Sequence, residues 1–324
     1  MVKSEVAIVM STYNGSRYLR EQIDSILAQD FKDWDLYIRD DMSSDNTSMI
    51  LRDYEEKYDN IHVVENNNIN LGAKRSFLKL VQFVDAKYYM FSDQDDFWLP
   101  NKVSLTLEAM KAAEEESSNM RIPVLVHTNY RIVDSKLAEL RTPPASFKSY
   151  TDLSSLSINN CITGCTMMIN QALKNLVGDV VDADSVGMHD WWFGLIANCF
   201  GTVSYLPQVT ILYRQHEGNV VGANTGMADS GSGSKMKKIL RGIRKNLRYY
   251  RKEFKRDSIT ARQIYYFREH YSEILTDDKK RELDVLYKGL IGGPRAGIAL
   301  IKELKPQSRN KEVKWVMYYA LITK

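Results

Sequence analysis

The sequence contains few cysteines and no long apolar run. Its three cysteines are an odd number among 324 residues, which excludes a framework of paired disulfides and predicts reduced thiols. Cys161 and Cys165 have no matching second pair, so a zinc site is not expected. No stretch approaches the roughly 18 apolar residues of a membrane-spanning helix, and no apolar segment follows a basic N-terminus. We therefore expect a cytoplasmic protein without a secretory signal.

The composition is that of a globular protein whose charge is unevenly distributed. Hydrophobic residues make up 44% and charged residues 26% of the chain, enough for one substantial core and a smaller appendage. The net charge is only +3, yet Lys235 to Arg256 holds eleven Lys or Arg residues and a single acid, Glu253. The preceding segment, Gly222 to Ser234, has the composition of a linker. The predicted parts are a main domain over residues 1–220, a linker over 221–234 and a helical region over 235–324.

Short apolar runs alternate with amphipathic segments along the first 115 residues. Such alternation predicts an α/β fold, Rossmann-like, in which helices cover both faces of a mostly parallel sheet. The expected strands are Val6–Met10, Leu36–Ile38, Ile61–Val64 and Tyr88–Phe91, and the expected helices are Arg17–Gln29, Asn46–Tyr58, one from Gly72, and Pro100–Glu116. Residues 116–220 are expected to add strands at Val124–His127 and Thr166–Ile169 and a helix at His189–Phe200.

An acidic cluster, Asp93-Gln94-Asp95-Asp96, follows the fourth expected strand directly. Ligands of parallel α/β sheets bind beyond the carboxyl ends of the strands. Two carboxylates one residue apart at such a place can bind a hard divalent cation, Mg²⁺ or Mn²⁺. The cation would bridge a diphosphate and stabilise it as a leaving group. The alternative is an acidic turn that caps the next helix.

A second acidic pair, Asp40-Asp41, ends the second expected strand. A carboxylate at this place can accept a hydrogen bond from the N3–H group of uracil or thymine. Helix capping is again the alternative, and Ser44, Asp45 or Asn46 is expected to cap the helix that follows.

Taken together, these motifs resemble those of family 2 glycosyltransferases of the GT-A fold. The matching segments are Ser11-Thr12-Tyr13-Asn14-Gly15, the run that begins at Asp40-Asp41, Asn70-x-Gly72 and Asp93-x-Asp95-Asp96. Their order and spacing match over roughly residues 4–220, and their joint occurrence is far more specific than any one of them. The run from Ser92 to Trp98 looks most like the rhamnosyltransferase-like branch of the family.

The resemblance implies a binding site for a nucleotide sugar. The residues that it assigns to the donor nucleotide are Ser11, Thr12, Tyr13, Asn14, Asp41, Lys74, Asp93 and Gln94. Asp41 matches the carboxylate that reads the base, so the donor is expected to be dTDP- or UDP-linked. One position departs from the family pattern. Many members carry an arginine early in the helix after Asn-x-Gly, where this chain has Phe77, and Lys74 is expected to substitute for it.

The resemblance also implies a divalent metal, Mn²⁺ or Mg²⁺, with Asp95 as its direct ligand. His216 belongs to the run Tyr213-Arg214-Gln215-His216. We expect it to be a further metal ligand or to contact the diphosphate, and Arg214 to neutralise the diphosphate charge. A structural histidine at a strand end is the alternative.

Inverting sugar transfer needs a base for the acceptor hydroxyl, and Asp190 lies where the family places that acid. The alternative is that Asp190 caps its helix while Trp191 and Trp192 belong to the core. The segment with Gly164 and Cys165 resembles the one that lies under the transferred sugar. The other residues expected on the sugar or acceptor side are Asp96, Trp98, His189 and Arg214.

The basic segment from Met236 to Phe254 has apolar residues at helical spacing and cations on its other face. Such a helix can lie on an anionic membrane surface, which suits a lipid-linked acceptor, or it can pack on the catalytic domain. Nucleic acid is not expected as a partner, because nothing else in the chain supports it. The apolar stretch Lys314 to Ile322 is a candidate for a core contact, a homodimer contact or the membrane interface.

The sequence therefore predicts an inverting, metal-dependent glycosyltransferase. It would move a sugar, with rhamnose as one candidate, from a dTDP- or UDP-linked donor to a glycan or lipid-linked acceptor in bacterial surface polysaccharide synthesis. It would act in the cytoplasm or at the inner face of the cell membrane. The alternatives are a sugar nucleotidyltransferase, which usually has a basic glycine-rich phosphate loop unlike Tyr13 to Ser16, and an inactive sugar-nucleotide-binding module, which predicts a broken metal motif or a missing base.

Overall fold

The computed structural model of the chain describes residues 4–116, 122–141, 152–178, 182–217, 235–308 and 311–323. The chain divides into two compact units. The first comprises Met1–Phe147, Ile162–Val181 and Met188–Val220, and the second comprises Lys148–Cys161, Asp182–Gly187 and Val221–Lys324. The second unit thus includes two short segments that precede the predicted boundary at residue 220. The predicted linker, 221–234, lies outside the described residues.

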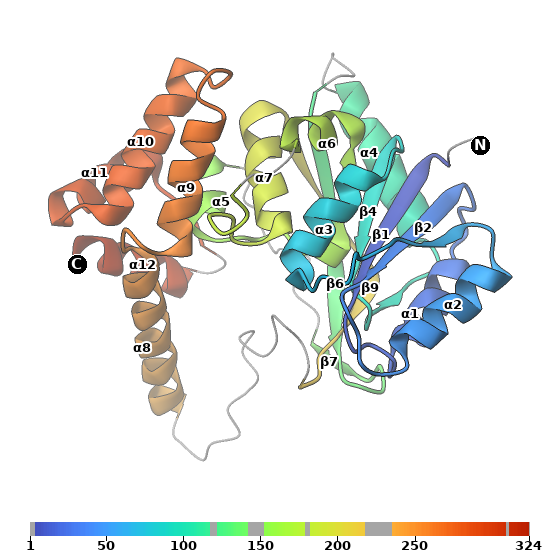
Figure 1. The fold of residues 1–324 in the computed structure, drawn as a ribbon. Coiled ribbons are helices and arrows are strands. Elements are labelled where there is room, and N and C mark those ends of the chain that lie inside the picture. Colours follow the sequence, from blue (N-terminus) through green and yellow to red (C-terminus); the bar gives the residue numbers. More distant parts are fainter. Residues whose placement is uncertain are drawn as a thin grey trace. The chain divides into compact units, whose positions relative to one another are not determined.

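A single mixed sheet forms the centre of the first unit (Figure 1). Its strands, within the described residues, are β1 (Val6–Thr12), β2 (Trp34–Asp40), β3 (Ile61–Val63), β4 (Tyr88–Ser92), β5 (Phe97–Trp98), β6 (Val124–Val133), β7 (Glu139–Arg141), β8 (Met167–Asn170) and β9 (Thr202–Arg214). Their order is β3-β2-β1-β4-β8-β6-β9-β5, and β7 pairs with β6. Strands β1 to β4 are parallel, as are β6 and β9, while β8 runs antiparallel between β4 and β6. The predicted α/β fold is confirmed.

Helices cover both faces of this sheet, as predicted (Figure 1). They are α1 (Leu19–Leu27), α2 (Thr47–Lys57), α3 (Gly72–Phe83), α4 (Lys102–Glu116), α6 (Gln171–Val177) and α7 (His189–Phe200). Buried residues of α1, α2 and α4 share one hydrophobic cluster with alternate side chains of β1 and β4. On the opposite face, Phe77 of α3 and Phe193 of α7 contact Phe91 of β4, with ring centroids 6.0 and 5.4 Å apart.

The turn from α7 into β9 depends on a glycine. A Cβ atom on Gly201 would lie 1.8 Å from the carbonyl oxygen of Pro123, so no larger residue fits without a backbone shift. The Thr202 amide donates to the same oxygen at 2.9 Å, and Thr202 pairs with Val124 of β6. This close approach sets the start of β9, which then runs alongside β6 and ends at Arg214.

The described part of the second unit is helical. Its helices are α5 (Leu153–Ile158), α8 (Lys235–Glu253), α9 (Ile259–His270), α10 (Asp277–Ile291), α11 (Pro294–Leu304) and α12 (Lys311–Ile322). Ser258 and Thr276 cap α9 and α10, each accepting a hydrogen bond from a backbone amide of the first turn. The predicted helical C-terminal region is confirmed. Among the residues described, we find no helix with the length and apolar character needed to cross a membrane.

Candidate active site

The polar segments singled out in the sequence gather at one edge of the sheet. Strands β1, β2 and β4 are parallel neighbours, so the loops that follow Thr12, Asp40 and Ser92 leave the sheet on the same side. Ser11 is half-buried near the end of β1. The buried Thr12 hydroxyl donates to Asp40 Oδ1 at 2.9 Å. This edge therefore brings together the motifs of the first 115 residues.

Side chains of the loop after β2 bind the backbone amides of the loop after β1. The amides of Asn14, Gly15 and Ser16 donate to Ser43 Oγ, Thr47 Oγ1 and Asp45 Oδ2 at 2.8, 2.9 and 3.1 Å. Asn14 has a left-handed φ of 49°, and its Oδ1 accepts from the Ser44 amide at 2.8 Å. A phosphate loop uses such amides to bind its anion. Because these amides are already bonded within the protein, the geometry argues against the nucleotidyltransferase alternative.

Gln94 joins this loop to the acidic loop that follows β4. Its Oε1 accepts from the Tyr13 amide at 2.8 Å, and its Nε2 donates to the Tyr13 carbonyl at 3.0 Å. A Cβ on Gly15 would lie 2.2 Å from Gln94 Oε1, so the close approach needs glycine. The Tyr13 ring stays 52% exposed and is accessible to a ligand. The structure therefore gives Gln94, assigned to the donor from the sequence, a backbone-positioning contact.

Asp41 directly follows β2, and its buried carboxylate lies at the N-terminus of α3. Its carboxylate accepts from the Leu71 and Gly72 amides at 2.7 and 2.6 Å and pairs with Arg39. Burial acts to raise the pKa of this carboxyl, but the bonds from Leu71, Arg39 and Gly72 lower it overall. Asp41 is therefore a fixed anion that caps α3, and its contact with the base stays a prediction.

The helix α3 differs from the family pattern as the sequence indicates. Phe77 is 2% exposed, and its ring lies 4.4 Å from that of His189, centroid to centroid. It is a core residue and presents no cation to a donor. Lys74 is half-buried in the first turn of α3 and remains the predicted substitute for the arginine.

The two predicted metal ligands lie together. His216 Nε2 is 2.8 Å from Asp95 Oδ2, although 121 residues separate them. The His216 ring also packs on Tyr18, with centroids 4.8 Å apart. Burial raises the pKa of the Asp95 carboxyl, and His216 opposes this effect. A carboxylate oxygen and an imidazole nitrogen that converge in this way suit a divalent cation such as Mn²⁺, so the residues fit the implied metal.

Arg214 holds the acidic loop in place. Its guanidinium donates to the Asp95 carbonyl at 2.6 Å, to the Ser135 carbonyl at 2.8 Å and to Glu21 Oε2 at 2.5 Å. Its backbone amide donates to Asp96 Oδ1 at 2.9 Å. The side chain is 1% exposed and its guanidinium bonds protein groups, so it positions the loop. This buried position does not support the prediction that Arg214 contacts the diphosphate, the acceptor or the sugar. Glu21, its partner on α1, belongs to no sequence motif, so its role at the site could not be predicted from the sequence.

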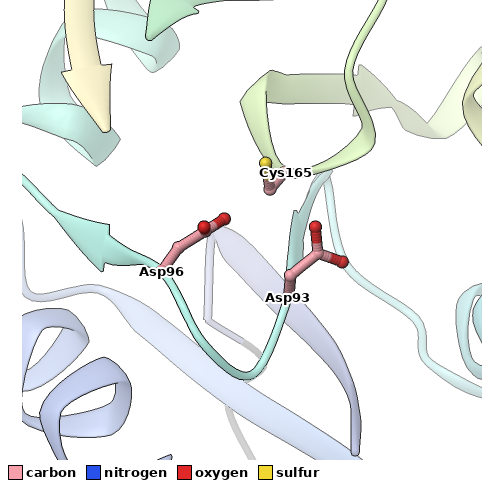
Figure 2. Close-up of side chains that lie close together, drawn as sticks. All are labelled: Asp93, Asp96 and Cys165. Carbon is pink, nitrogen blue, oxygen red and sulfur yellow. The ribbon is translucent and has the colours of Figure 1, made fainter. Parts of the chain in front are cut away.

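Asp93 and Asp96 of the acidic loop form a compact cluster with Cys165, which lies in a short turn just before β8 (Figure 2). Their ligand atoms lie within 4.8 Å of one another, and only Asp93 is more than slightly exposed. Burial raises the pKa of Asp93 to about 7, and the charges of Asp95 and Asp190 add to this. Burial also raises the pKa of the Cys165 thiol. Carboxylates crowded in this way favour a bound cation or a ligand that donates hydrogen bonds.

A buried lysine in α4 lies near these acids. Within the described chain, Lys102 Nζ has no hydrogen-bond partner, and it lies 4.8 Å from the ring centroid of Trp98. Burial lowers the pKa of Lys102 to about 8, and Cys165 and Asp96 act in the opposite direction. No motif in the sequence marks Lys102, although its four-residue spacing from buried Thr106 places both on one helix face.

Asp190 lies in the first turn of α7, close enough to Asp93 for its charge to raise the pKa of Asp93. His189 beside it is buried, and both of its ring nitrogens lack a hydrogen-bond partner among the described residues. Burial lowers the pKa of His189 to about 3. A Cβ on Gly164 would lie 2.7 Å from His189 Nε2 and 3.7 Å from Asp190 Oδ2. The structure thus brings Asp190, Gly164 and the acidic cluster together, and it makes His189 a neutral packing residue.

Trp98 is placed differently from the expectation that it contacts the sugar or acceptor. It lies in β5, is 1% exposed and belongs to the hydrophobic cluster shared with α4. A ligand cannot reach it without opening the core. Its role is to anchor the chain that follows the acidic loop, through the pairing of β5 with β9.

Comparisons with known proteins identify the family to which the chain is similar. The family described as "Glycosyl transferase family 2" matches residues 7–177. The dTDP-rhamnosyl transferase RfbG of Shigella flexneri is 30% identical over 256 residues, which cover 75% of this chain and 81% of that protein.

Two solved structures share the fold at low sequence identity. The mannosyltransferase PcManGT from Pyrobaculum calidifontis, in complex with GDP-Man and Mn²⁺, has a TM-score of 0.57 at 14% identity and covers 99% of this chain and 86% of its own. S. aureus TarS 1–349 in complex with UDP has a TM-score of 0.53 at 14% identity, with coverage of 98% and 90%. Both share the α/β fold described above. The family match and the relative together show that this chain is a glycosyltransferase and belongs to glycosyl transferase family 2.

Proposed function

We propose that this glycosyltransferase transfers its sugar with inversion, from a dTDP- or UDP-linked donor and with a divalent cation. The observation that carries the proposal is the convergence of the Asp95–His216 pair with the cluster of Asp93, Asp96 and Cys165, next to Asp190. This arrangement combines ligands for a cation, acceptors for sugar hydroxyls and a carboxylate for proton transfer within one site.

Each residue of the site would have a separate role in the reaction. Asp95 Oδ2 and His216 Nε2 would hold Mn²⁺ or Mg²⁺, which supplies charge stabilisation for the departing diphosphate. Asp190 would take the proton of the acceptor hydroxyl as that oxygen attacks the anomeric carbon. Asp96 is fully buried and accepts from the Arg214 amide at 2.9 Å, so it would hold the acidic loop in place, while the more exposed Asp93 would accept from a sugar hydroxyl.

The comparisons support the choice of donors to test. The name of the Shigella relative favours dTDP-rhamnose, and the UDP bound to TarS favours UDP-sugars. The Mn²⁺ in the mannosyltransferase complex supports a divalent metal. We propose a glycan or lipid-linked acceptor of bacterial surface polysaccharide synthesis, and action at the cytoplasmic side of the membrane.

A donor screen tests this function. The purified chain is mixed with UDP-, dTDP- and GDP-sugars and Mn²⁺, Mg²⁺ or EDTA, and slow donor hydrolysis is followed. Metal-dependent release of a nucleoside diphosphate from one donor is expected. In a parallel reaction with UTP or dTTP and a sugar 1-phosphate, release of pyrophosphate would instead identify a nucleotidyltransferase. No release and no calorimetric binding of any donor would overturn the proposal.

Replacement of the proposed base separates catalysis from binding. Asp190→Asn should lower transfer by at least about 100-fold, the usual contribution of general base catalysis, while the affinity for the nucleoside diphosphate stays within about twofold. The matched control is Asp278→Asn, since Asp278 also lies in a first helical turn but is exposed. Wild-type turnover in the Asp190→Asn variant would remove Asp190 from the reaction.

A further inference from the structure

Helix α8 exposes a row of cations. Arg241, Arg244, Arg248 and Arg251 recur at spacings of three and four residues, which places them on one helix face, and all of them are exposed. Glu253, the single acid of α8, is 8% exposed and therefore does not neutralise this row. We call these four residues the arginine row.

Helix α12 exposes large apolar side chains. Trp315 is 68% exposed, Tyr319 is 52% exposed and Ile322 is 38% exposed. Their spacing of four and three residues puts them on one helix face, while Met317 and Leu321 face the interior of the unit. An exposed tryptophan next to other apolar side chains is uncommon on a surface that contacts only water. We call Trp315, Tyr319 and Ile322 the apolar row.

A hydrogen bond links the arginine row to the residue that follows α12. Arg251, the last member of the arginine row, donates from Nη2 to Thr323 Oγ1 at 3.4 Å. Thr323 lies one turn beyond Tyr319, and its hydroxyl donates to the Tyr319 carbonyl at 2.8 Å. Helices α8 and α12 also pack against each other. The two rows therefore lie on neighbouring helices of one unit, although 72 residues separate Arg251 from Thr323 in the sequence. We consider the two rows together as one candidate surface.

We propose that this surface binds an anionic phospholipid membrane. Tryptophan and tyrosine side chains favour the headgroup region of a bilayer, and arginines near the surface are attracted to anionic lipids. A partner that accepts apolar side chains and also carries negative charge can bind both rows. A purely polyanionic partner would bind only the arginine row. The inference extends the proposed lipid-linked acceptor. It is tested without donor or acceptor, so its failure is distinguishable from failure of the proposed transfer.

Tryptophan fluorescence reports on this surface directly. The other four tryptophans, Trp34, Trp98, Trp191 and Trp192, are at most 8% exposed, so a change in solvent contact is reported mainly by Trp315. The full chain is titrated with vesicles of phosphatidylcholine, with and without phosphatidylglycerol. A blue shift of the emission is expected only with phosphatidylglycerol, and it should weaken as salt is added.

Variants test each row separately, with binding measured by vesicle sedimentation. Arg244→Gln combined with Arg248→Gln should lower the partition coefficient about 30-fold, about fivefold for each charge. Trp315→Ala should lower it about tenfold. The matched control is Phe83→Ala on α3, because Phe83 is also 68% exposed but is not accompanied by an arginine row; it should bind as the wild type does.

Three results would overturn the inference. The first is an equal blue shift with neutral and anionic vesicles, or none with either. The second is a shift with a DNA duplex but not with vesicles, which would assign the surface to nucleic acid. The third is a shift that depends on protein concentration in the absence of lipid, which would assign it to a second copy of the chain.

Discussion

Replacement of Gln94 by alanine tests whether the loop after β1, which we call the donor loop, is ordered before the donor binds. Gln94→Ala removes the two hydrogen bonds to the Tyr13 backbone, of 2.8 and 3.0 Å. Each is worth about 1 kcal/mol net, so the pair is worth about 2 kcal/mol, or about 30-fold in an equilibrium constant. The remaining contacts of Asn14, Gly15 and Ser16 are untouched by this change.

This loss can appear in two quantities, and their sum is the prediction. If the loop detaches, the donor must order it again, and the dissociation constant of UDP or dTDP rises by up to about 30-fold. If the loop stays in place, the free energy of unfolding falls by up to about 2 kcal/mol instead. Calorimetric titration with UDP and dTDP in the presence of Mn²⁺ measures the first quantity, and urea unfolding measures the second.

Two further variants make this measurement specific. Gln94→Glu keeps an acceptor for the Tyr13 amide but brings a carboxylate oxygen against the Tyr13 carbonyl, so its loss should be at least as large. Gln171→Ala removes an exposed glutamine that bonds Asp85 at 3.0 Å and should leave nucleotide affinity unchanged. If Gln94→Ala changes neither affinity nor stability by more than about 0.5 kcal/mol, the positioning role is refuted.

The remaining predictions concern the metal, a close backbone approach and a buried charge. His216→Ala should raise the Mn²⁺ concentration needed for nucleotide binding by at least about tenfold; an unchanged requirement would exclude His216 as a ligand. Gly201→Ala should lower the free energy of unfolding by about 1–3 kcal/mol, because its Cβ would lie 1.8 Å from the Pro123 carbonyl, whereas Gly242→Ala in α8, with open space around it, should be neutral or stabilising. The pKa of Lys102 is lowered from 10.5 to about 8 by burial, so the unfolded chain binds more protons between these pH values and wild-type stability should rise across them by about 3 kcal/mol. Lys102→Met should remove that rise in urea unfolding curves, and equal pH dependence of the two proteins would contradict the reasoning.

The elements with strong local signals could be predicted from the sequence, and those fixed by distant pairing could not. The apolar run Val6–Met10 is buried on both faces, which is the pattern of a central parallel strand. Strand β9 has no such pattern, since Thr202–Arg214 contains Pro207, which usually argues against a strand. Its pairing with β6 also shifts register after Thr128, so its side chains do not keep one alternation.

The residue types of the site could be predicted, but not the direction in which each side chain points. A charged residue at a strand end suggests a contact with a ligand, yet Arg214 is directed into the protein and binds Glu21 and the Asp95 carbonyl. Its partners come from α1 and from the acidic loop, more than 100 residues away in the sequence. His189 is likewise buried because the first turns of α7 have no exposed face. Such roles depend on packing between segments, which no local pattern contains.

Most hydrogen-bonding groups at the edge of the sheet beside Asp41 are already bonded within the protein. This limits the groups that can recognise the base of the proposed donor. The amides of Asn14, Gly15 and Ser16 already bond side chains, so they cannot read the base without rearrangement. An ionised carboxylate has about four acceptor positions, and Asp41 uses three of them for Arg39, Leu71 and Gly72. One position remains for an N3–H group, which uracil and thymine share. For the proposed donors, discrimination between UDP and dTDP would then come from contacts to the 5-methyl group or the ribose 2′-hydroxyl, and the exposed side chains of Tyr13 and Met42 at this edge are accessible for such a contact.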